Sequence, residues 1–427
     1  MRRTDYPAIG ETLYTSKLPN GLPIFVVPKK GYRKSFACFV TNYGGADRRF
    51  TLAGEAKDTP AGVAHYLEHK MFDMPEGNAL LALEAAGANA NAFTSEAMTA
   101  YHFTCTQNFD ENLRTLLRFV STPYYTRQSV DKERGIIAQE IRMYEDDPDD
   151  QVYMGLMGQL FAHNPLRDDV AGTVWTIQDI TPQVLYDCHK VFYHPSNMAL
   201  CVVGDADPEA VELAAREILP PESAPLPVRD YGPAEGLEPV RARSERVMEV
   251  SAPIFLGGLK LGPAAMGPEA HRERITAGLA LRCLYGRSSP AYLDLYGKGL
   301  LNATFGCGAD YAAGQGFVTF GGESRDPDAA AGALMEAAET VAENGFDPAL
   351  FDRQKKASYG GQLRALGDFR SLGVNLAEGC FAGYQVLDGF RILETVTCSD
   401  ASAWVREHIV PDRTALSIIR PKEADVP

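Results

Sequence analysis

A proline-rich stretch divides this chain into two halves that repeat one pattern of strands and helices. Residues 220–245 contain six prolines and two glycines, a composition typical of a linker. We therefore expect an N-terminal domain over residues 1–219 and a C-terminal domain over residues 246–427. Because strands and helices mix in both halves, the pattern predicts a duplicated α+β scaffold.

The repeat can be followed segment by segment. An apolar strand at 254–261 corresponds to the one at 35–43, and a helix at 269–284 falls where a helix beginning at residue 63 falls. The further correspondences are 292–296 with the helix at 80, 305–320 with the hairpin 88–106, 328–343 with 110–121, 348–363 with 126–146, and 414–419 with 198–203.

The first half carries a His-x-x-Glu-His pattern on a predicted helix. No glycine or proline interrupts residues 63–74. His65 and His69 then lie one turn apart on one face, with Glu68 beside them. Two imidazoles on one face can hold a metal ion, and a neighbouring carboxylate can transfer a proton. The alternative is a surface helix that merely carries a Glu–His pair.

A second predicted helix, residues 126–146, offers the third ligand that a zinc site needs. Glu133 and Glu140 are seven residues apart, almost two turns, and so project from one side of that helix. One carboxylate can bind the metal ion while the other orients an imidazole. Taken alone, two such glutamates are usually solvated surface residues.

These motifs resemble the inverted zincins, the pitrilysin/insulinase family of zinc metallopeptidases. The resemblance covers most of the chain, and the length is similar to the short-chain, mitochondrial-processing-peptidase-like branch and its soluble bacterial members. It also rests on three further segments: the opening hairpin 18–27, the stretch 87–94 with Asn-Ala-Phe-Thr, and the stretch 194–200 before a buried strand.

The resemblance implies a role for each motif residue. His65, His69 and Glu140 would hold one Zn²⁺ per chain, Glu68 would be the general base that activates water, and Glu133 would support a zinc ligand. The edge-strand residues that pair with the substrate backbone would be Asn91, Ala92 and Phe93. The implied fold is two homologous domains, each a mostly antiparallel sheet with helices packed on it.

The second half lacks the ligands. Residues 280–284 replace the His-x-x-Glu-His pattern, and Arg353 and Gly360 align with Glu133 and Glu140. In the family, such a domain forms the opposite wall of a substrate chamber. A purely stabilising domain is the alternative.

One segment departs from the family pattern. Where the family often has an Arg and a Tyr that help to hold the substrate carbonyl, this chain has Tyr296 and Asn302. Loss of one such donor lowers a rate by roughly two to three powers of ten. Tyr101 and Tyr311 are candidates to compensate.

Composition narrows the class of partner. The net charge of −15 and the pI near 5.1 argue against nucleic acid. There is no run of eighteen apolar residues, and no apolar core follows the basic N-terminus, so we expect neither a membrane span nor a secretory signal. The eight scattered cysteines indicate reduced core residues in a cytoplasmic protein, and the resemblance implies a bacterial one.

Two further features are interpreted as structural and not functional. His102 lies within a predicted strand and is interpreted as a packing residue. The acidic run 145–150 lacks the glycine and terminal glutamate of an EF-hand loop, and is interpreted as a solvated helix end.

The predicted function is hydrolysis of peptides or unfolded segments, in a homodimer or a heterodimer with a related chain. Dimerisation is implied by the resemblance alone. The alternatives are a catalytically weak or silent subunit that binds peptide or assembles a complex, and a purely structural subunit.

Overall fold

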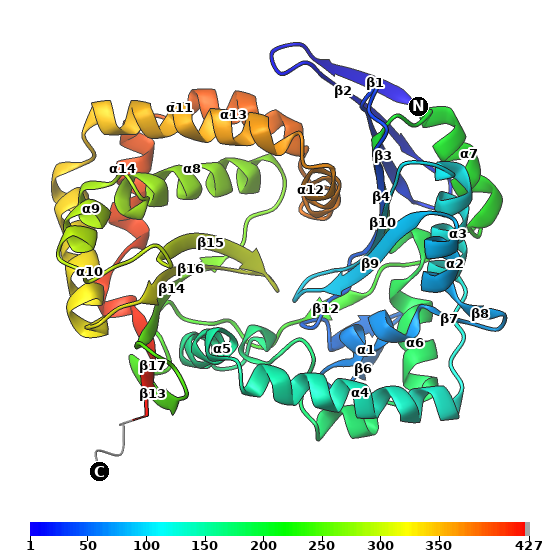
Figure 1. Ribbon diagram of the computed structural model, residues 1–427, viewed down its shortest axis with the longest axis horizontal. Helices are drawn as coiled ribbons and strands as arrows, with labels where there is room; N and C mark the ends of the chain where they lie inside the picture. The colour runs from blue at the N-terminus through cyan, green and yellow to red at the C-terminus, as the bar shows by residue number, and fades with distance from the viewer. Residues whose placement is uncertain (423–427) are drawn as a thin grey trace. The chain divides into compact units, whose positions relative to one another are not determined.

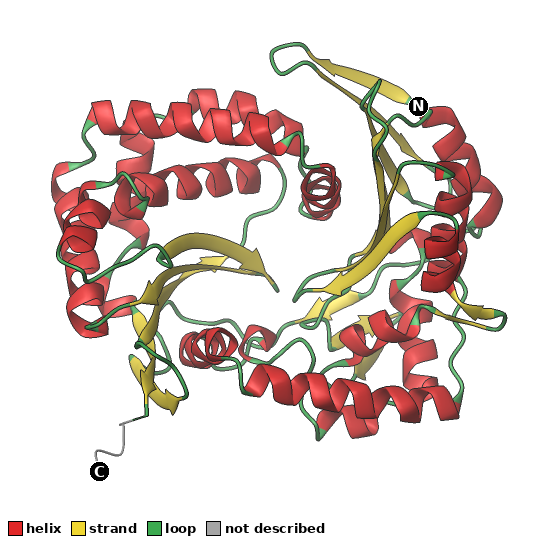
Figure 2. Ribbon diagram, in the orientation of Figure 1, coloured by secondary structure: helices red, strands yellow, loops and turns green. Residues whose placement is uncertain are grey.

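The computed structural model describes residues 1–422 and shows an α+β protein built from two homologous, mostly antiparallel sheets with helices packed on them (Figures 1 and 2). By contact, the chain falls into two compact units. The first unit contains Met1–Ile141, Asp169–Tyr231 and Leu363–Leu387, and the second contains Arg142–Asp168, Gly232–Gln362 and residues 388–422. These units group residues by contact, whereas the predicted domains were defined by the repeat in the sequence. The domain boundaries at 219 and 246 therefore stay a prediction.

The first unit has a seven-stranded sheet in the order β1-β2-β3-β11-β4-β10-β9. Its strands are β1 (Arg2–Tyr6), β2 (Glu11–Lys17), β3 (Pro23–Pro28), β4 (Ser35–Thr41), β9 (Ala88–Thr94), β10 (Thr99–Cys105) and β11 (Met198–Gly204). Smaller strands are β5 (Arg49–Leu52), β6 (Glu55–Asp58), β7 (Asp73–Met74), β8 (Gly77–Asn78) and β12 (Val228–Asp230). Its helices are α1 (Val63–Lys70), α2 (Ala79–Ala85), α3 (Phe109–Ser121), α4 (Arg127–Glu145), α6 (Pro182–Phe192), α7 (Pro208–Ile218) and α12 (Phe369–Phe381).

The second unit has a five-stranded sheet in the order β13-β17-β14-β16-β15. Its strands are β13 (Arg243–Met248), β14 (Ile254–Pro263), β15 (Gly306–Ala312), β16 (Gln315–Glu323) and β17 (Ala415–Pro421). Its helices are α5 (Pro148–Leu160), α8 (Pro268–Tyr285), α9 (Pro290–Gly297), α10 (Pro327–Asn344), α11 (Pro348–Ala365), α13 (Gly389–Thr395) and α14 (Cys398–His408). Among residues 1–422, no helix combines the length and apolarity that a bilayer span requires.

The duplication is visible in strand order and direction. In the first sheet β3 pairs parallel with β11, and the pairs β11–β4, β4–β10 and β10–β9 are antiparallel. In the second sheet β13 pairs parallel with β17, and β17–β14, β14–β16 and β16–β15 are antiparallel. The five-strand pattern is therefore the same in both halves, which confirms the predicted fold.

The centre of the first sheet is buried on both faces. Every residue of β4 and β11 is buried, which explains why Met198–Gly204 is apolar without alternation. Helix α12 covers one face, because it packs on β4 and β11. A Cβ atom at Gly373 would lie 2.6 Å from the Phe36 ring, so the glycine permits this close approach. Helices α12, α13 and α14 are not among the elements predicted from the sequence.

The helix that carries the two histidines begins at Val63, as predicted, but ends earlier than predicted. It ends at Lys70 rather than Met74, since residues 73–74 form strand β7. Its N-cap is Gly62. Gly62 has φ 97°, and a Cβ atom there would lie 2.5 Å from the Ala171 carbonyl oxygen. Contact with this distant loop therefore sets where the helix begins.

Two other differences concern segments without predicted strands. Strands β5 and β6 form a hairpin whose turn residues Ala53 and Gly54 both have positive φ, as a tight hairpin turn requires. The predicted linker contains β12, which pairs with β5, and the first residues of β13.

We predict that Gly373→Ala lowers the free energy of unfolding by about 1–3 kcal/mol, because the added methyl group overpacks against the buried Phe36 ring. Chemical denaturation of the purified variant measures this change. Gly135→Ala in α4 is the matched control, since nothing lies within 4 Å of its added Cβ atom, and it should be neutral or stabilising by up to about 1 kcal/mol. Wild-type stability in Gly373→Ala would contradict the packing described for α12.

Candidate metal centre

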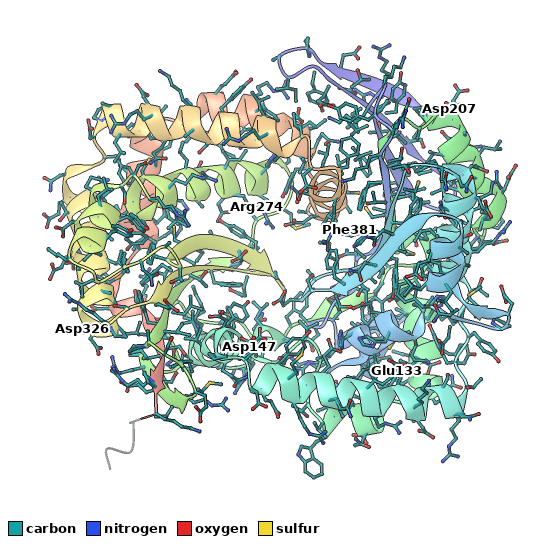
Figure 3. The ribbon with its side chains drawn as sticks, in the orientation of Figure 1. Glu133, Asp147, Asp207, Arg274, Asp326 and Phe381 are labelled. Carbon is teal, nitrogen blue, oxygen red and sulfur yellow. The ribbon has the colours of Figure 1, made fainter. Side chains whose placement is uncertain are left out.

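Two helices of the first unit hold the candidate site together. Helix α1 buries Tyr66 and Leu67, and α4 buries a stripe that includes Val130 and Ile137. The Tyr66 hydroxyl donates a hydrogen bond to the Val130 carbonyl oxygen, which fastens α1 to the first turn of α4. Figure 1 shows α1 beside α4, and Figure 3 labels Glu133 on that part of α4.

The predicted ligands meet between these helices. Atoms of His65, His69 and Glu140 that can bind a metal ion all lie within 4.8 Å of one another. His65 Nε2 is 3.7 Å from Glu140 Oε1, and His69 Nε2 is 3.4 Å from Glu140 Oε2. The two imidazole rings lie edge to face with their centroids 4.6 Å apart. Within residues 1–422, no second group of three or more His, Cys, Asp or Glu residues comes this close together.

This donor set fits zinc. Bond lengths of about 2.0–2.1 Å at tetrahedral angles place neighbouring ligand atoms about 3.3–3.5 Å apart, close to the two His–Glu140 distances. Three protein ligands of the His/His/Glu type leave one position open, as catalytic zinc sites do. His65 Nδ1 is buried and has no hydrogen-bond partner, so Nε2 is the ring nitrogen of His65 that takes part in the cluster.

Glu133 orients one of the imidazoles. Its carboxylate oxygen lies 3.0 Å from His69 Nδ1, so a proton on that nitrogen leaves the Nε2 lone pair directed toward Glu140. The buried Lys70 ammonium lies 3.9 Å from Glu133, and it also pairs with Asp73 and donates to the Ser129 carbonyl oxygen. Lys70 therefore offsets part of the negative charge beneath the site.

The pKa shifts follow the charge distribution. Burial, and next the neighbouring His69, lower the pKa of His65 to about 4, so its imidazole is neutral. Burial also lowers the pKa of His69, but hydrogen bonds with Glu133 and Glu140 outweigh this effect and raise the pKa to about 9. Without a metal ion, a protonated His69 thus offsets part of the negative charge of the two carboxylates.

Glu68 links the centre to the edge of the sheet. The Thr94 hydroxyl, in the last residue of β9, donates to Glu68 Oε2 at 2.9 Å. Burial raises the pKa of Glu68, which suits a group that must both accept and return a proton. One carboxylate oxygen is positioned by the protein, and the other makes no such bond within residues 1–422.

The other predicted residues lie elsewhere. Asn91, Ala92 and Phe93 belong to the edge strand β9. Tyr101 is fully buried, and its hydroxyl is 2.8 Å from that of Tyr193, so it is a core residue. Three predicted residues belong to the second unit: Tyr296, Asn302 and Tyr311. Tyr296 is 54% exposed and stacks on Tyr292, and the Asn302 side-chain amide donates a hydrogen bond to Glu323. Tyr311 lies in β15, with the Arg274 guanidinium over its ring.

Two residues of the site had no predicted role. Thr94 lies in the quoted Asn-Ala-Phe-Thr stretch, but only the structure shows its bond to Glu68. Lys70 directly follows the second histidine. A lysine three residues before an aspartate is a recognisable ion-pair spacing, yet its burial depends on the packing of α4.

Comparison with known proteins shows which family the chain resembles. The sequence model of the insulinase family (peptidase family M16) matches residues 52–174, and that of the peptidase M16 inactive domain matches residues 179–358. The chain is 37% identical to the uncharacterized zinc protease YmfH of Bacillus subtilis, over 98% of this chain and 99% of that protein.

Solved structures share the fold. A structure described as an M16-like peptidase from Alicyclobacillus acidocaldarius superposes with a TM-score of 0.94 and 32% identity, covering 98% of this chain and all of that one. The periplasmic protease PqqL of Escherichia coli has a TM-score of 0.73 and 19% identity, and this chain covers 48% of it, so that likeness concerns the fold alone. On these matches, the chain belongs to peptidase family M16, the insulinase family.

Proposed function

We propose that this protein is a zinc-dependent endopeptidase that hydrolyses peptides or unfolded segments. The convergence of His65, His69 and Glu140 beside the Glu68 carboxylate carries the proposal. The names of relatives such as YmfH support it, since they are called zinc proteases.

The distances support the proposed ligand roles. His65 and His69 present Nε2 atoms, and Glu140 presents both carboxylate oxygens, to one point between α1 and α4. Glu133 keeps His69 in the tautomer that can bind a metal ion. Zinc held by these residues would supply Lewis-acid polarisation of a carbonyl and would make water acidic enough to be activated near neutral pH.

Glu68 accepts the proton of the attacking water and later returns it. Thr94 holds one oxygen of its carboxylate, which leaves the other to take a proton from the attacking water. The same carboxyl group then returns a proton to the leaving amine. The raised pKa of Glu68 brings its two protonation states closer in free energy, which favours this two-way transfer.

The substrate would bind as an added strand. Strand β9 is the last strand of its sheet, and no strand pairs with its outer edge within the described residues. Asn91, Ala92 and Phe93 would offer main-chain groups to an extended peptide, which gives affinity with little dependence on sequence. The Ala92 amide currently donates to the Asn91 side chain at 2.8 Å, so that side chain would have to move aside.

Other parts of the proposal rest on the family alone. They are a substrate chamber between the two halves and pairing as a homodimer or with a related chain. A cytoplasmic location is proposed from the scattered cysteines, whereas PqqL, which shares the fold, is named a periplasmic protease.

A second candidate is a catalytically weak or silent subunit that binds peptide. Tyr296 is exposed and the Asn302 side chain is hydrogen-bonded to Glu323. These observations favour the second candidate, because neither residue supplies the donor to the substrate carbonyl that the family's Arg and Tyr provide. Tight zinc binding without cleavage of any fluorogenic peptide, alone or with a related chain, would select this candidate.

We predict that Glu140→Gln abolishes stoichiometric zinc binding, and that Glu133→Gln weakens it about 10- to 100-fold, because the first change removes a charged ligand and the second loosens His69. Competitive chelator titration followed by elemental analysis measures both effects. Glu145→Gln, an exposed change on the same helix, should bind like wild type. Undiminished binding in Glu140→Gln would contradict the ligand set.

We predict that Glu68→Gln keeps its zinc and lowers peptide cleavage by at least about 10²-fold, because the amide cannot accept the proton. A quenched fluorogenic peptide assay and the zinc content of the same sample measure the two quantities. Glu84→Gln on the exposed side of α2 is the control and should cleave normally. Normal peptide turnover in Glu68→Gln would contradict the proposed role of Glu68 in proton transfer.

A further inference from the structure

The face of the first sheet that α12 covers carries polar groups without partners beside the edge strand. In the β9–β10 register, His102 lies opposite Asn91 and Phe93 lies opposite Ala100. Side chains alternate along a strand, so His102, Asn91 and Phe93 share one face, and Thr94 and Tyr101 point to the other, where α1 lies. His102 packs against Phe36 and Phe93, with ring centroids at 5.5 Å and 6.3 Å.

Arg370 brings a cation to this face. It is an exposed residue in the first turn of α12, and its guanidinium lies 5.8 Å from the centre of the Phe93 ring. Within residues 1–422, no carboxylate pairs with this guanidinium. The neighbouring Asp368 caps the helix instead, since it accepts bonds from the Ser371 amide and hydroxyl.

The position of Arg370 is not explained by helix stability. The N-terminus of a helix carries partial positive charge, so a cation in the first turn is unfavourable there. The contact with Phe93 recovers some of this cost. A guanidinium that lies over an aromatic ring without a carboxylate partner keeps its hydrogen-bond donors free for an anion.

His102 adds a second donor. Its side chain is only 6% exposed, and neither ring nitrogen has a hydrogen-bond partner. Burial, and next the nearby Arg370, lower the pKa of His102 to about 4, so the ring is neutral and carries one unused N–H group. A buried polar group without a partner costs free energy that an incoming acceptor would recover.

We propose that Arg370, His102 and Phe93 form a subsite for an acidic side chain of the peptide bound along β9. The proposal rests on the function proposed above. Phe93 is both the backbone partner of the peptide and the support for Arg370. Alternate side chains of an added strand point to the same face of the sheet. Glu or Asp can therefore reach the subsite only from peptide positions whose side chains point to the face that carries Phe93, and these positions are two residues apart.

A scan of one glutamate along an otherwise neutral fluorogenic peptide tests this subsite. Each Glu peptide is compared with its Gln counterpart through the ratio of kcat/KM values. We expect Glu to be favoured about 3- to 10-fold at alternate positions in wild type, less so at high salt. Arg370→Met keeps an apolar stem over Phe93 and should bring the ratio to about 1. Arg370→Glu should favour Lys at the same positions.

Arg364→Met is the matched control, because Arg364 is an exposed arginine of the preceding helix, and it should keep the wild-type ratio. The same ratio, measured as peptide Kd in the Glu68→Gln protein, separates binding from chemistry. Cleavage without a Glu/Gln preference, or a preference that survives in Arg370→Met, overturns the subsite and leaves the peptidase proposal standing. Preferential binding without any cleavage in wild type supports the subsite and overturns the peptidase proposal.

Discussion

The crossing of α1 and α4 is the constraint on which the site depends. The residues that meet there are separated by about seventy positions in the sequence, so only tertiary packing brings them together. The Tyr66 hydroxyl bound to the Val130 carbonyl fixes where the helices cross, and the His69–Glu133 pair fixes the rotation of one ring. With both in place, His65, His69 and Glu140 need little further movement to hold an ion, which lowers the cost of binding it.

Charge beneath the site is arranged in layers. Glu140 faces the two imidazoles, Glu133 lies behind His69, and Lys70 lies behind Glu133. A buried carboxylate next to a neutral imidazole would be costly without such a partner. An ion bound here would replace the proton that Glu133 and Glu140 stabilise on His69, so its positive charge would enter an environment already built for one.

The sequence predicts the candidate metal ligands because their spacing is a local property. Helical periodicity alone puts His65 and His69 on one face, and does the same for Glu133 and Glu140. The repeat in strand order was likewise readable from the apolar runs. The features that the sequence does not predict depend on distant contacts. The N-cap of α1 at Gly62 is set by contact with Ala171, and α12 packs on strands more than 160 residues away in the sequence. Thr94 and Arg370 acquire their partners only through those contacts.

The central claim is that one zinc ion is held by two imidazoles and a single carboxylate. Anomalous diffraction at the zinc absorption edge, from crystals of the zinc-loaded protein, tests it directly. The account predicts one strong peak about 2.0–2.2 Å from His65 Nε2, His69 Nε2 and a Glu140 oxygen. A peak bound by other residues, or a zinc-loaded crystal in which Glu140 lies away from the ion, would contradict it.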